Sequence, residues 1–216
     1  MAVVFDFDGV LVDSVAPVTE SINAALREHG LEQRDPDELR SLIGPPTYSA
    51  FSALLDDSPD SPEVSAVVAT YRAHYDAVYL TATRVFDGIP EMLEELSRHQ
   101  ALAVATSKSR DFAQPLLDAL GLARHFTVVA AADPFTDDDD KSAIVARALE
   151  ELGERSGAMV GDRSFDMLAA RTHGLRPLGV GWGIGTEEEL RVAGAEAIAA
   201  TPAHLLALLV PARDAP

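Results

Sequence analysis

Short apolar runs of strand length recur along the chain and alternate with segments that have a helical pattern. The runs occupy residues 2–5, 101–106, 126–131, 157–162 and 176–181. Within each run apolar and polar residues do not alternate strictly, which is typical of strands buried on both faces of a parallel sheet. The pattern therefore predicts a parallel sheet enclosed between helices.

The segments between these runs carry apolar residues at helical spacing. Ile89, Leu93 and Leu96 lie on one stripe of residues 89–99, and a second stripe over residues 141–153 ends at a glycine that would stop the helix. Strands that alternate with helices form a parallel α/β sheet with right-handed crossovers, and ligands bind beyond the carboxyl ends of its strands. We therefore predict a Rossmann-like α/β core.

Residues 14–83 break this alternation because they contain helix signals only. One helix pattern over residues 18–30 ends at a glycine, and a longer one over residues 61–80 begins with a Ser-Pro pair. We therefore predict an α/β core domain formed by residues 1–13 and 84–216, interrupted by an all-helical domain inserted after the first strand.

Composition and charge limit the classes of function. The 216 residues suffice for one core and a small accessory domain. The chain has 17 basic and 35 acidic residues, and a net charge of -18 disfavours nucleic acid and anionic membranes as partners. It has no cysteine, so disulfides, thiolate zinc sites and a cysteine nucleophile are excluded.

Without a signal peptide or an apolar run of about 20 residues, we expect a cytoplasmic protein, monomeric or homodimeric.

Polar residues follow the ends of several predicted strands. They are Asp6, Asp8, Thr106, Lys141, Asp162 and Asp166. The carboxyl ends of parallel strands share one edge of the sheet, so these side chains are expected to converge. Carboxylates so close together could not all stay ionised without a cation, and Mg²⁺ prefers hard oxygen ligands of this kind. The sequence therefore predicts a magnesium site.

The same residue types suit the chemistry of a phosphate ester. Lys141 and the Thr106 hydroxyl are of the types that hold phosphate oxygens. One of the first two aspartates could attack phosphorus and form an aspartyl phosphate, which divides a difficult hydrolysis into two easier steps. The other could act as general acid and then as general base, while Gly9 lets the chain turn away from the site.

Four segments of the chain resemble, in order and spacing, the signature motifs of the haloacid dehalogenase superfamily of phosphotransferases. They are VVFDFDGVLVDS, LAVATSKS, DDKSAIVARAL and MVGDRSFDMLAA. The chain looks closest to the phosphoglycolate phosphatase-like branch, and LIGPPTYSAF at residues 42–51 is similar to cap segments of that branch. The resemblance implies that residues 14–83 form a helical cap domain over the site.

The resemblance also implies roles for the acidic residues. Asp6 would be the nucleophile and Asp8 the general acid and base. Mg²⁺ would be held by the Asp6 carboxylate, the main-chain carbonyl of Asp8 and Asp162, with Asp166 in support. The dehalogenases proper lack an aspartate at the position of Asp8 and need no metal, so the resemblance favours phosphoryl chemistry.

Substrate-binding roles fall to the second and third motifs. Thr106, Ser107 and Lys141 would bind the phosphoryl group, and Lys141 would neutralise charge beside the nucleophile. The third motif of the family often has proline after its lysine, whereas Ser142 follows Lys141 here. Lys108 is therefore a competing candidate for the cation that faces the phosphate.

The activity expected from these features is that of a Mg²⁺-dependent phosphatase with a small phosphorylated metabolite, similar to phosphoglycolate, as its substrate. Two alternatives share the motifs: a phosphomutase resembling β-phosphoglucomutase, and a nucleoside monophosphate phosphatase (5'-nucleotidase). The glycine-rich stretch GVGWGIG at residues 179–185 does not fit a dinucleotide-binding loop and is expected as a loop beside the site.

Overall fold

A six-stranded parallel sheet forms the centre of the molecule, in the order β5-β4-β1-β6-β7-β8. The computed structural model describes residues 1–133 and 140–210. The strands are β1 (Ala2–Phe5), β4 (Ala101–Ser109), β5 (Val128–Ala132), β6 (Gly157–Gly161), β7 (Arg176–Val180) and β8 (Ala197–Ala199). The predicted parallel α/β fold is confirmed.

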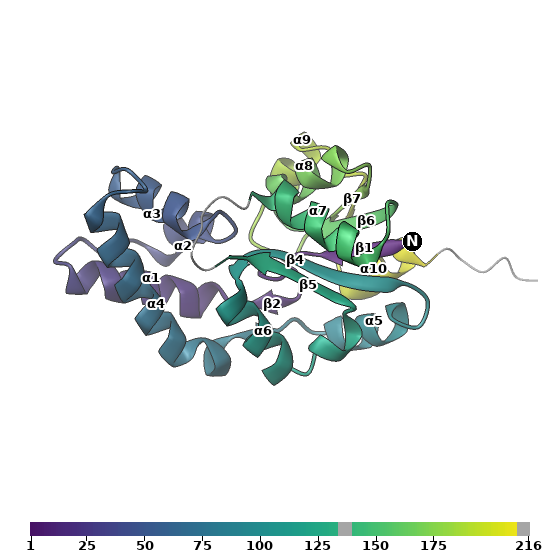
Figure 1. Ribbon diagram of the computed structural model, residues 1–216, viewed down its shortest axis with the longest axis horizontal. Helices are drawn as coiled ribbons and strands as arrows, with labels where there is room; N and C mark the ends of the chain where they lie inside the picture. The colour runs from purple at the N-terminus through teal and green to yellow at the C-terminus, as the bar shows by residue number, and fades with distance from the viewer. Residues whose placement is uncertain (134–139, 211–216) are drawn as a thin grey trace, which may run out of the picture.

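Helices cover both faces of this sheet (Figure 1). They are α5 (Ile89–Leu96), α6 (Arg110–Ala119) and α10 (Pro202–Leu209) on one face, α7 (Lys141–Leu152) and α8 (Ser164–Thr172) on the other, with α9 (Glu187–Val192) beside α8 and a 3₁₀ turn at Ala123–His125. Side chains of β1 alternate between the two layers: Val4 packs with the helices α7 and α8, and Val3 and Phe5 pack with the other layer. Burial on both faces explains why the strands lack an alternating pattern.

The register of β1 sets the position of the residues that follow it. Phe5 lies opposite Val104 of β4 and Val160 of β6, and the amide of Asp6 donates to the carbonyl of Val160 at 2.9 Å. Asp6 therefore emerges between the ends of two neighbouring parallel strands.

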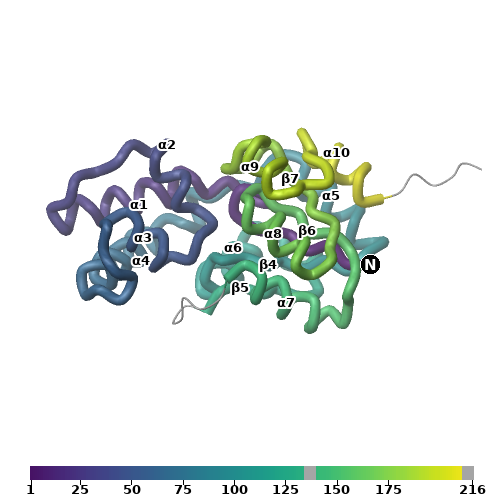
Figure 2. Tube along the Cα trace, turned by 90° about the horizontal axis from the view of Figure 1, so that it is seen from above, coloured from purple at the N-terminus to yellow at the C-terminus, as the bar shows by residue number. Residues whose placement is uncertain are grey.

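Four of the five α-helices between β1 and β4 lie beside the sheet at its carboxyl-terminal edge (Figures 1 and 2). They are α1 (Val15–Glu28), α2 (Pro36–Leu39), α3 (Thr47–Leu55) and α4 (Pro62–Ala82), with a 3₁₀ turn at Arg40–Leu42. The hydroxyl of Ser61 accepts from the Val64 amide at 3.0 Å, as the Ser-Pro signal indicated for the start of α4. We call these four helices the helical insertion.

A short antiparallel ribbon joins the two ends of the helical insertion. β2 (Val12–Asp13) pairs with β3 (Arg84–Val85). Neither this ribbon nor β8 was predicted from the sequence, because strands of two or three residues are too short to show a period.

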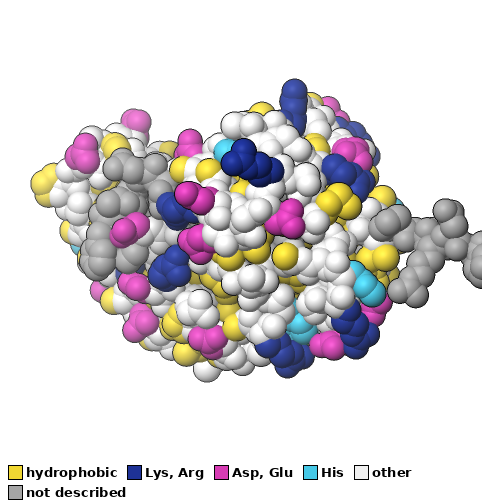
Figure 3. All heavy atoms as spheres, turned by 45° about the vertical axis from the view of Figure 1, so that its right-hand side comes forward, with side chains coloured by type: hydrophobic (Ala, Val, Ile, Leu, Met, Phe, Trp, Pro, Cys, Tyr) yellow, Lys and Arg dark blue, Asp and Glu magenta, His cyan; other side chains and the backbone are white. Residues whose placement is uncertain are grey.

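On the face seen in Figure 3, acidic and basic side chains are interspersed. Among the helices of residues 1–133 and 140–210, we find none with the length and apolar character needed to cross a membrane.

Leu93 tests the packing of α5 against the sheet, because its side chain is fully buried in the main core cluster. We expect Leu93→Ala to lower the free energy of unfolding by about 2–5 kcal/mol, since the substitution removes buried methyl groups and leaves a cavity. Leu80→Ala in α4, whose side chain is 43% exposed, should cost no more than about 0.5 kcal/mol. Denaturant unfolding of both variants measures the difference, and equal losses would contradict this account of the core.

Candidate active site

The turn after β1 carries the first two aspartates and brings the chain against the end of β6. Gly9 has φ +79°, a conformation that favours glycine. A Cβ atom at this position would lie 2.2 Å from Oδ2 of Asp162. Glycine therefore allows the turn and also the close approach of the two acidic motifs.

Asp6 shares one ammonium group with Asp166. Lys141 is the first residue of α7, and its Nζ lies 2.7 Å from Oδ1 of Asp6 and 3.0 Å from Oδ1 of Asp166. The ammonium also donates to the carbonyl oxygen of Ala105 at 3.0 Å. The other carboxylate oxygen of Asp166, Oδ2, accepts from the Arg163 amide at 3.1 Å, whereas its Oδ1 has the ion pair with Lys141 but no hydrogen bond.

Asp162 is held from one side only. Its Oδ2 accepts from the amide of Ile184 at 2.6 Å, and its buried Oδ1 has no hydrogen-bond partner. The Gly179–Gly185 stretch lies beside the site as expected: a Cβ atom on Gly183 would lie 2.4 Å from the Cβ of Asp162. The glycine-rich loop thus packs directly on this carboxylate and donates one hydrogen bond to it.

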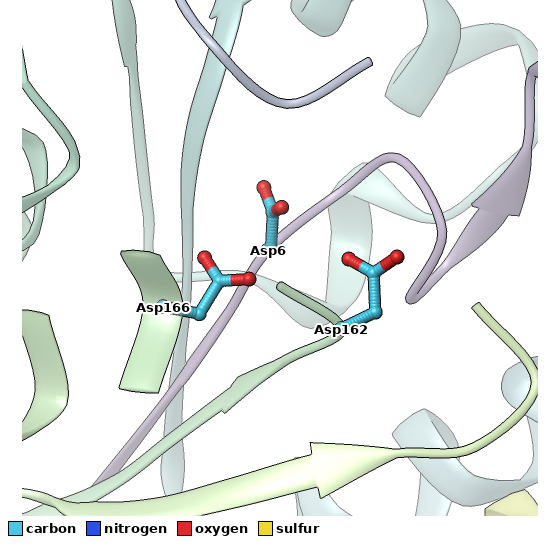
Figure 4. A group of neighbouring side chains, drawn as sticks. All are labelled: Asp6, Asp162 and Asp166. Atoms are coloured by element: carbon cyan, nitrogen blue, oxygen red, sulfur yellow. The ribbon is translucent and has the colours of Figure 1, made fainter. Parts of the chain in front are cut away.

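Three buried carboxylates meet at this point, as Figure 4 shows with Asp6 between the other two. One oxygen from each of Asp6, Asp162 and Asp166 lies within 4.8 Å of the others. Burial raises the pKa of Asp6 to about 7, although Lys141 acts in the opposite direction. Burial, together with the charges of Asp166 and Asp6, raises the pKa of Asp162 well above its ordinary value.

This carboxylate group fits a divalent cation. Among the described residues Lys141 forms ion pairs with Asp6 and Asp166, whereas Asp162 forms none, so one positive charge faces a group of three carboxyls. Burial alone would lower the pKa of Lys141, but Asp166 and Asp6 raise it, so the lysine is charged. The buried Oδ1 of Asp162, which lacks a donor, is the ligand type that Mg²⁺ prefers.

Asp8 lies in a different electrostatic environment from Asp6. The hydroxyl of Ser14 donates to its Oδ1, and Nζ of Lys108 lies 3.2 Å from its Oδ2. Ser14 precedes α1 at the N-cap position but makes no capping hydrogen bond, because its hydroxyl is directed to Asp8. The sequence analysis gave Ser14 no role, although a serine at a helix start just after the first motif was the available signal.

The end of β4 places the second motif against a cavity. The pairing of β4 with β5 shifts register between Thr106 and Ser109, and the Lys108 amide donates to Oγ1 of Thr106 at 3.1 Å. The side chain of Lys108 is only 7% exposed and donates to the hydroxyl of Tyr75 in α4 at 2.8 Å. Burial alone would lower the pKa of Lys108, but Asp8 and Tyr75 raise it above the ordinary value.

The cavity lies between the helical insertion and the strand ends, and its volume is about 70 Å³. Its polar lining on the core side consists of Asp6, Asp8, Thr106, Ser107, Lys108 and Ser109. The opposite wall comes from the insertion and is mainly apolar and aromatic, with Phe51, Tyr71 and Tyr75. Lys141 does not line the cavity and lies behind Asp6, whereas Lys108 faces it.

All the residues expected at the site lie at one edge of the sheet, but they form two groups. Asp162, Asp166 and Lys141 surround Asp6 on one side. Lys108 and Asp8 meet on the side of the helical insertion. Tyr75, to which the sequence analysis assigned no role, joins this second group through its hydroxyl.

The chain is similar to known proteins over most of its length. A family model described as haloacid dehalogenase-like hydrolase matches residues 3–180. A 5'-nucleotidase from Pseudomonas aeruginosa is 35% identical over 192 residues, which make up 88% of this chain and 86% of that protein. A phosphoglycolate phosphatase from Agrobacterium fabrum is 32% identical over 83% of this chain and 80% of its own length.

Two further relatives extend the comparison. The tyrosine-protein kinase PtkA from Mycobacterium tuberculosis is 37% identical over 85% of this chain, but the match spans only 62% of that longer protein. The solved structure of a haloacid dehalogenase-like family protein from Streptococcus pneumoniae superposes with a TM-score of 0.87 at 29% identity, covering 97% of this chain and 98% of that one.

The match of the family model and the full-length structural similarity agree with the four motifs recognised in the sequence. Relatives named as phosphatases confirm the predicted enzyme class. This chain therefore belongs to the haloacid dehalogenase-like hydrolase family.

Proposed function

We propose that this enzyme is a Mg²⁺-dependent phosphatase that hydrolyses a small phosphomonoester through an aspartyl-phosphate intermediate on Asp6. The observation that carries the proposal is the group of three buried carboxylates beside a single ammonium, one of which, Asp6, also lines a small cavity. An excess of buried negative charge next to a cavity suits a cation and an anionic substrate that bind together. The predicted cytoplasmic location and monomeric or homodimeric state belong to the same proposal.

Mg²⁺ would be held by the carboxylates of Asp6 and Asp162 and the main-chain carbonyl of Asp8. Asp166 would act mainly from behind, because both of its oxygens already have partners in Lys141 and the Arg163 amide. The bound ion would supply positive charge that keeps the carboxylates ionised and polarises the phosphoryl oxygens.

Asp6 is suited to attack phosphorus because it lines the cavity and is held in place by Lys141. The Lys141 ammonium, 2.7 Å from Oδ1, stabilises the ionised form of the nucleophile against the cost of burial. In the first step a carboxylate oxygen forms a bond to phosphorus as the bond to the leaving oxygen breaks. In the second step water attacks phosphorus and releases the Asp6 carboxylate.

Asp8 is suited to carry the proton in both steps. It would donate a proton to the leaving oxygen, and the resulting carboxylate would then take a proton from the attacking water. Its two oxygens contact Ser14 and Lys108, so its orientation is controlled independently of the carboxylates around Asp6. The separation gives the two aspartates of one motif different environments and different roles.

Thr106, Ser107 and Lys108 would receive the phosphoryl oxygens, because all three line the cavity on the core side. Lys141 would neutralise Asp6 from behind. We thus assign the cation that faces the substrate to Lys108, and the predicted role of Lys141 is limited to charge balance at the nucleophile. The helical insertion would act as the cap that excludes bulk water and selects the leaving group.

A leaving group similar to glycolate is our first candidate. The cavity of about 70 Å³ favours a small substrate, and a phosphoglycolate phosphatase is among the relatives. The relative named 5'-nucleotidase, at 35% identity, supports a nucleoside monophosphate as the second candidate. A phosphomutase remains the third, because the same residues would serve if the phosphoryl group were returned to the sugar.

Asp6→Asn tests the nucleophile. We expect kcat to fall by a factor of about 10³ or more, because an amide cannot form the acyl phosphate. The circular dichroism spectrum should stay that of the wild type. Asp87→Asn changes an exposed acidic residue and serves as the matched control. Near-normal turnover of Asp6→Asn would contradict the assignment.

Asp162→Asn tests the metal site without an activity assay. The pKa of Asp162 is raised in the folded protein, so its contribution to stability is present at low pH and is lost as the pH rises above its ordinary value of 3.8. In EDTA, Asp162→Asn should therefore melt at a higher temperature than the wild type at pH 8, with a smaller difference at pH 5.

Added Mg²⁺ should reverse that order, because it raises the melting temperature of the wild type by binding the folded state. The variant should respond far less, and Asp87→Asn should respond as the wild type does. A wild-type melting temperature that does not change with Mg²⁺ would refute the proposed metal site.

A panel of phosphomonoesters distinguishes the three candidates. With Mg²⁺ we expect free phosphate to be released with the highest kcat/KM from phosphoglycolate, and with lower values from nucleoside 5'-monophosphates and sugar 1-phosphates. EDTA should suppress every rate. A preference for the nucleotides would support the second candidate, and isomerised sugar phosphate without free phosphate would support the mutase.

A further inference from the structure

Tyr75 lies in the aromatic wall that the helical insertion contributes to the cavity, and its hydroxyl contacts the core. It belongs to α4, and it is the largest of the fully buried side chains of the described residues. Its ring packs against Tyr71, Tyr79 and Phe112, with ring centroids 5.8, 5.6 and 5.0 Å away. Because Phe112 belongs to α6, this aromatic cluster joins the insertion to the core and fixes the ring of Tyr75.

The Tyr75 hydroxyl points to the ammonium of Lys108. The oxygen accepts a hydrogen bond from Nζ at 2.8 Å, and Nζ also lies 4.7 Å from the centroid of the Tyr75 ring. A lysine ammonium sits on a flexible stem with four carbons, so its position depends on the partners that hold it. Here those partners are Tyr75 on one side and Asp8, at 3.2 Å, on the other.

We propose that Tyr75 is a positioning residue that orients Asp8 through Lys108. The phenol holds the ammonium, the ammonium holds Oδ2 of the carboxyl group, and Ser14 holds Oδ1. This relay gives the proton-transfer group a single orientation when α4 is packed on α6. The inference rests on the proposed function only in taking Asp8 as the group that protonates the leaving oxygen.

The relay has a consequence that depends on the leaving group. An alkoxide leaves only if it is protonated, so hydrolysis of an alkyl phosphate requires a correctly oriented Asp8. A nitrophenolate leaves readily without a proton. The value of kcat/KM depends on the steps up to the first irreversible step, which is formation of the phosphoenzyme. It therefore reports protonation of the leaving oxygen and not the later hydrolysis of the phosphoenzyme.

Tyr75→Phe removes the hydroxyl and keeps the ring in its cluster. We expect kcat/KM for the best alkyl phosphate of the panel to fall by about 10-fold, a part of the 10²–10⁴-fold that a general acid contributes. For p-nitrophenyl phosphate, which needs little general-acid catalysis, the loss should stay below about 3-fold and reports only the change in the contact of Lys108 with the phosphoryl group. Tyr79→Phe is the matched control, because this residue lies one turn later in the same aromatic cluster and does not line the cavity. It should change neither value.

A double-mutant cycle tests whether Tyr75 acts through Lys108. Lys108→Met removes the ammonium while retaining a long apolar side chain. In that background, Tyr75→Phe should lower kcat/KM for the alkyl phosphate by less than about 2-fold, because the relay is already broken. Melting temperatures of Tyr75→Phe and Tyr79→Phe, measured in EDTA, show whether the two variants are equally well packed.

Each outcome bears on the proposal. Equal losses for alkyl and aryl phosphates in Tyr75→Phe would overturn it, as would full additivity with Lys108→Met or a loss in Tyr79→Phe of the same size. These results are distinct from a failure of the proposed function, in which the wild type would hydrolyse neither ester with Mg²⁺. A loss confined to the alkyl phosphate, and absent in the Lys108→Met background, supports the relay.

Discussion

Carboxylates buried close together lose hydration and repel one another, and the loss of hydration is the larger effect at the site around Asp6. Burial raises the pKa of Asp6 to about 7 and that of Asp162 well above its ordinary value, so the protein places acidic groups where their charges are costly. Lys141 offsets part of that cost through contacts with Asp6 and Asp166. A bound cation, as proposed, would reduce the remaining cost and would link the stability of this edge of the sheet to ligand binding.

The fold concentrates charge in this way because parallel strands end together. β1 lies between β4 and β6, so the residues just beyond it meet the ends of both neighbours. The turn after β1 and the glycine-rich loop can approach Asp162 closely only because they have glycine at the contact points. A Cβ atom at Gly9 or at Gly183 would collide with Asp162. These glycines therefore allow the segments around Asp162 to pack closely, and Gly9 also allows the chain to turn after β1.

The helical insertion completes the site with a different kind of surface. Its wall of the cavity is largely apolar and aromatic, whereas the core supplies hydroxyl, ammonium and carboxylate groups. One polar contact of the insertion, from Tyr75 to Lys108, reaches the ion pair at Asp8. Asp6 and Asp8 are separated by one residue. The ion-pair partner of Asp6, Lys141, belongs to the core, whereas the partner of Asp8, Lys108, is also held by Tyr75 of the insertion. This difference in surroundings supports the proposal that the two carboxyl groups have different roles.

The sequence by itself determined the elements whose signals are local. The apolar runs predicted β1 and β4 to β7, the Ser-Pro pair at Ser61 marked the start of α4, and the motifs named six residues that lie at one edge of the sheet. The short strands β2, β3 and β8 carry no period long enough to be recognised. The choice between the two lysines was also left open, because the order of motifs along the chain does not show which side chain faces the cavity.

Only the tertiary structure decided how these residues divide between two groups. Lys141 starts a helix behind Asp6, whereas the register shift at the end of β4 directs Lys108 toward the insertion, where Tyr75 and Asp8 hold it. Ser14 likewise caps nothing and instead contacts Asp8. Such contacts join residues far apart in sequence, and their geometry follows from the packing of helices on the sheet, which no local pattern encodes.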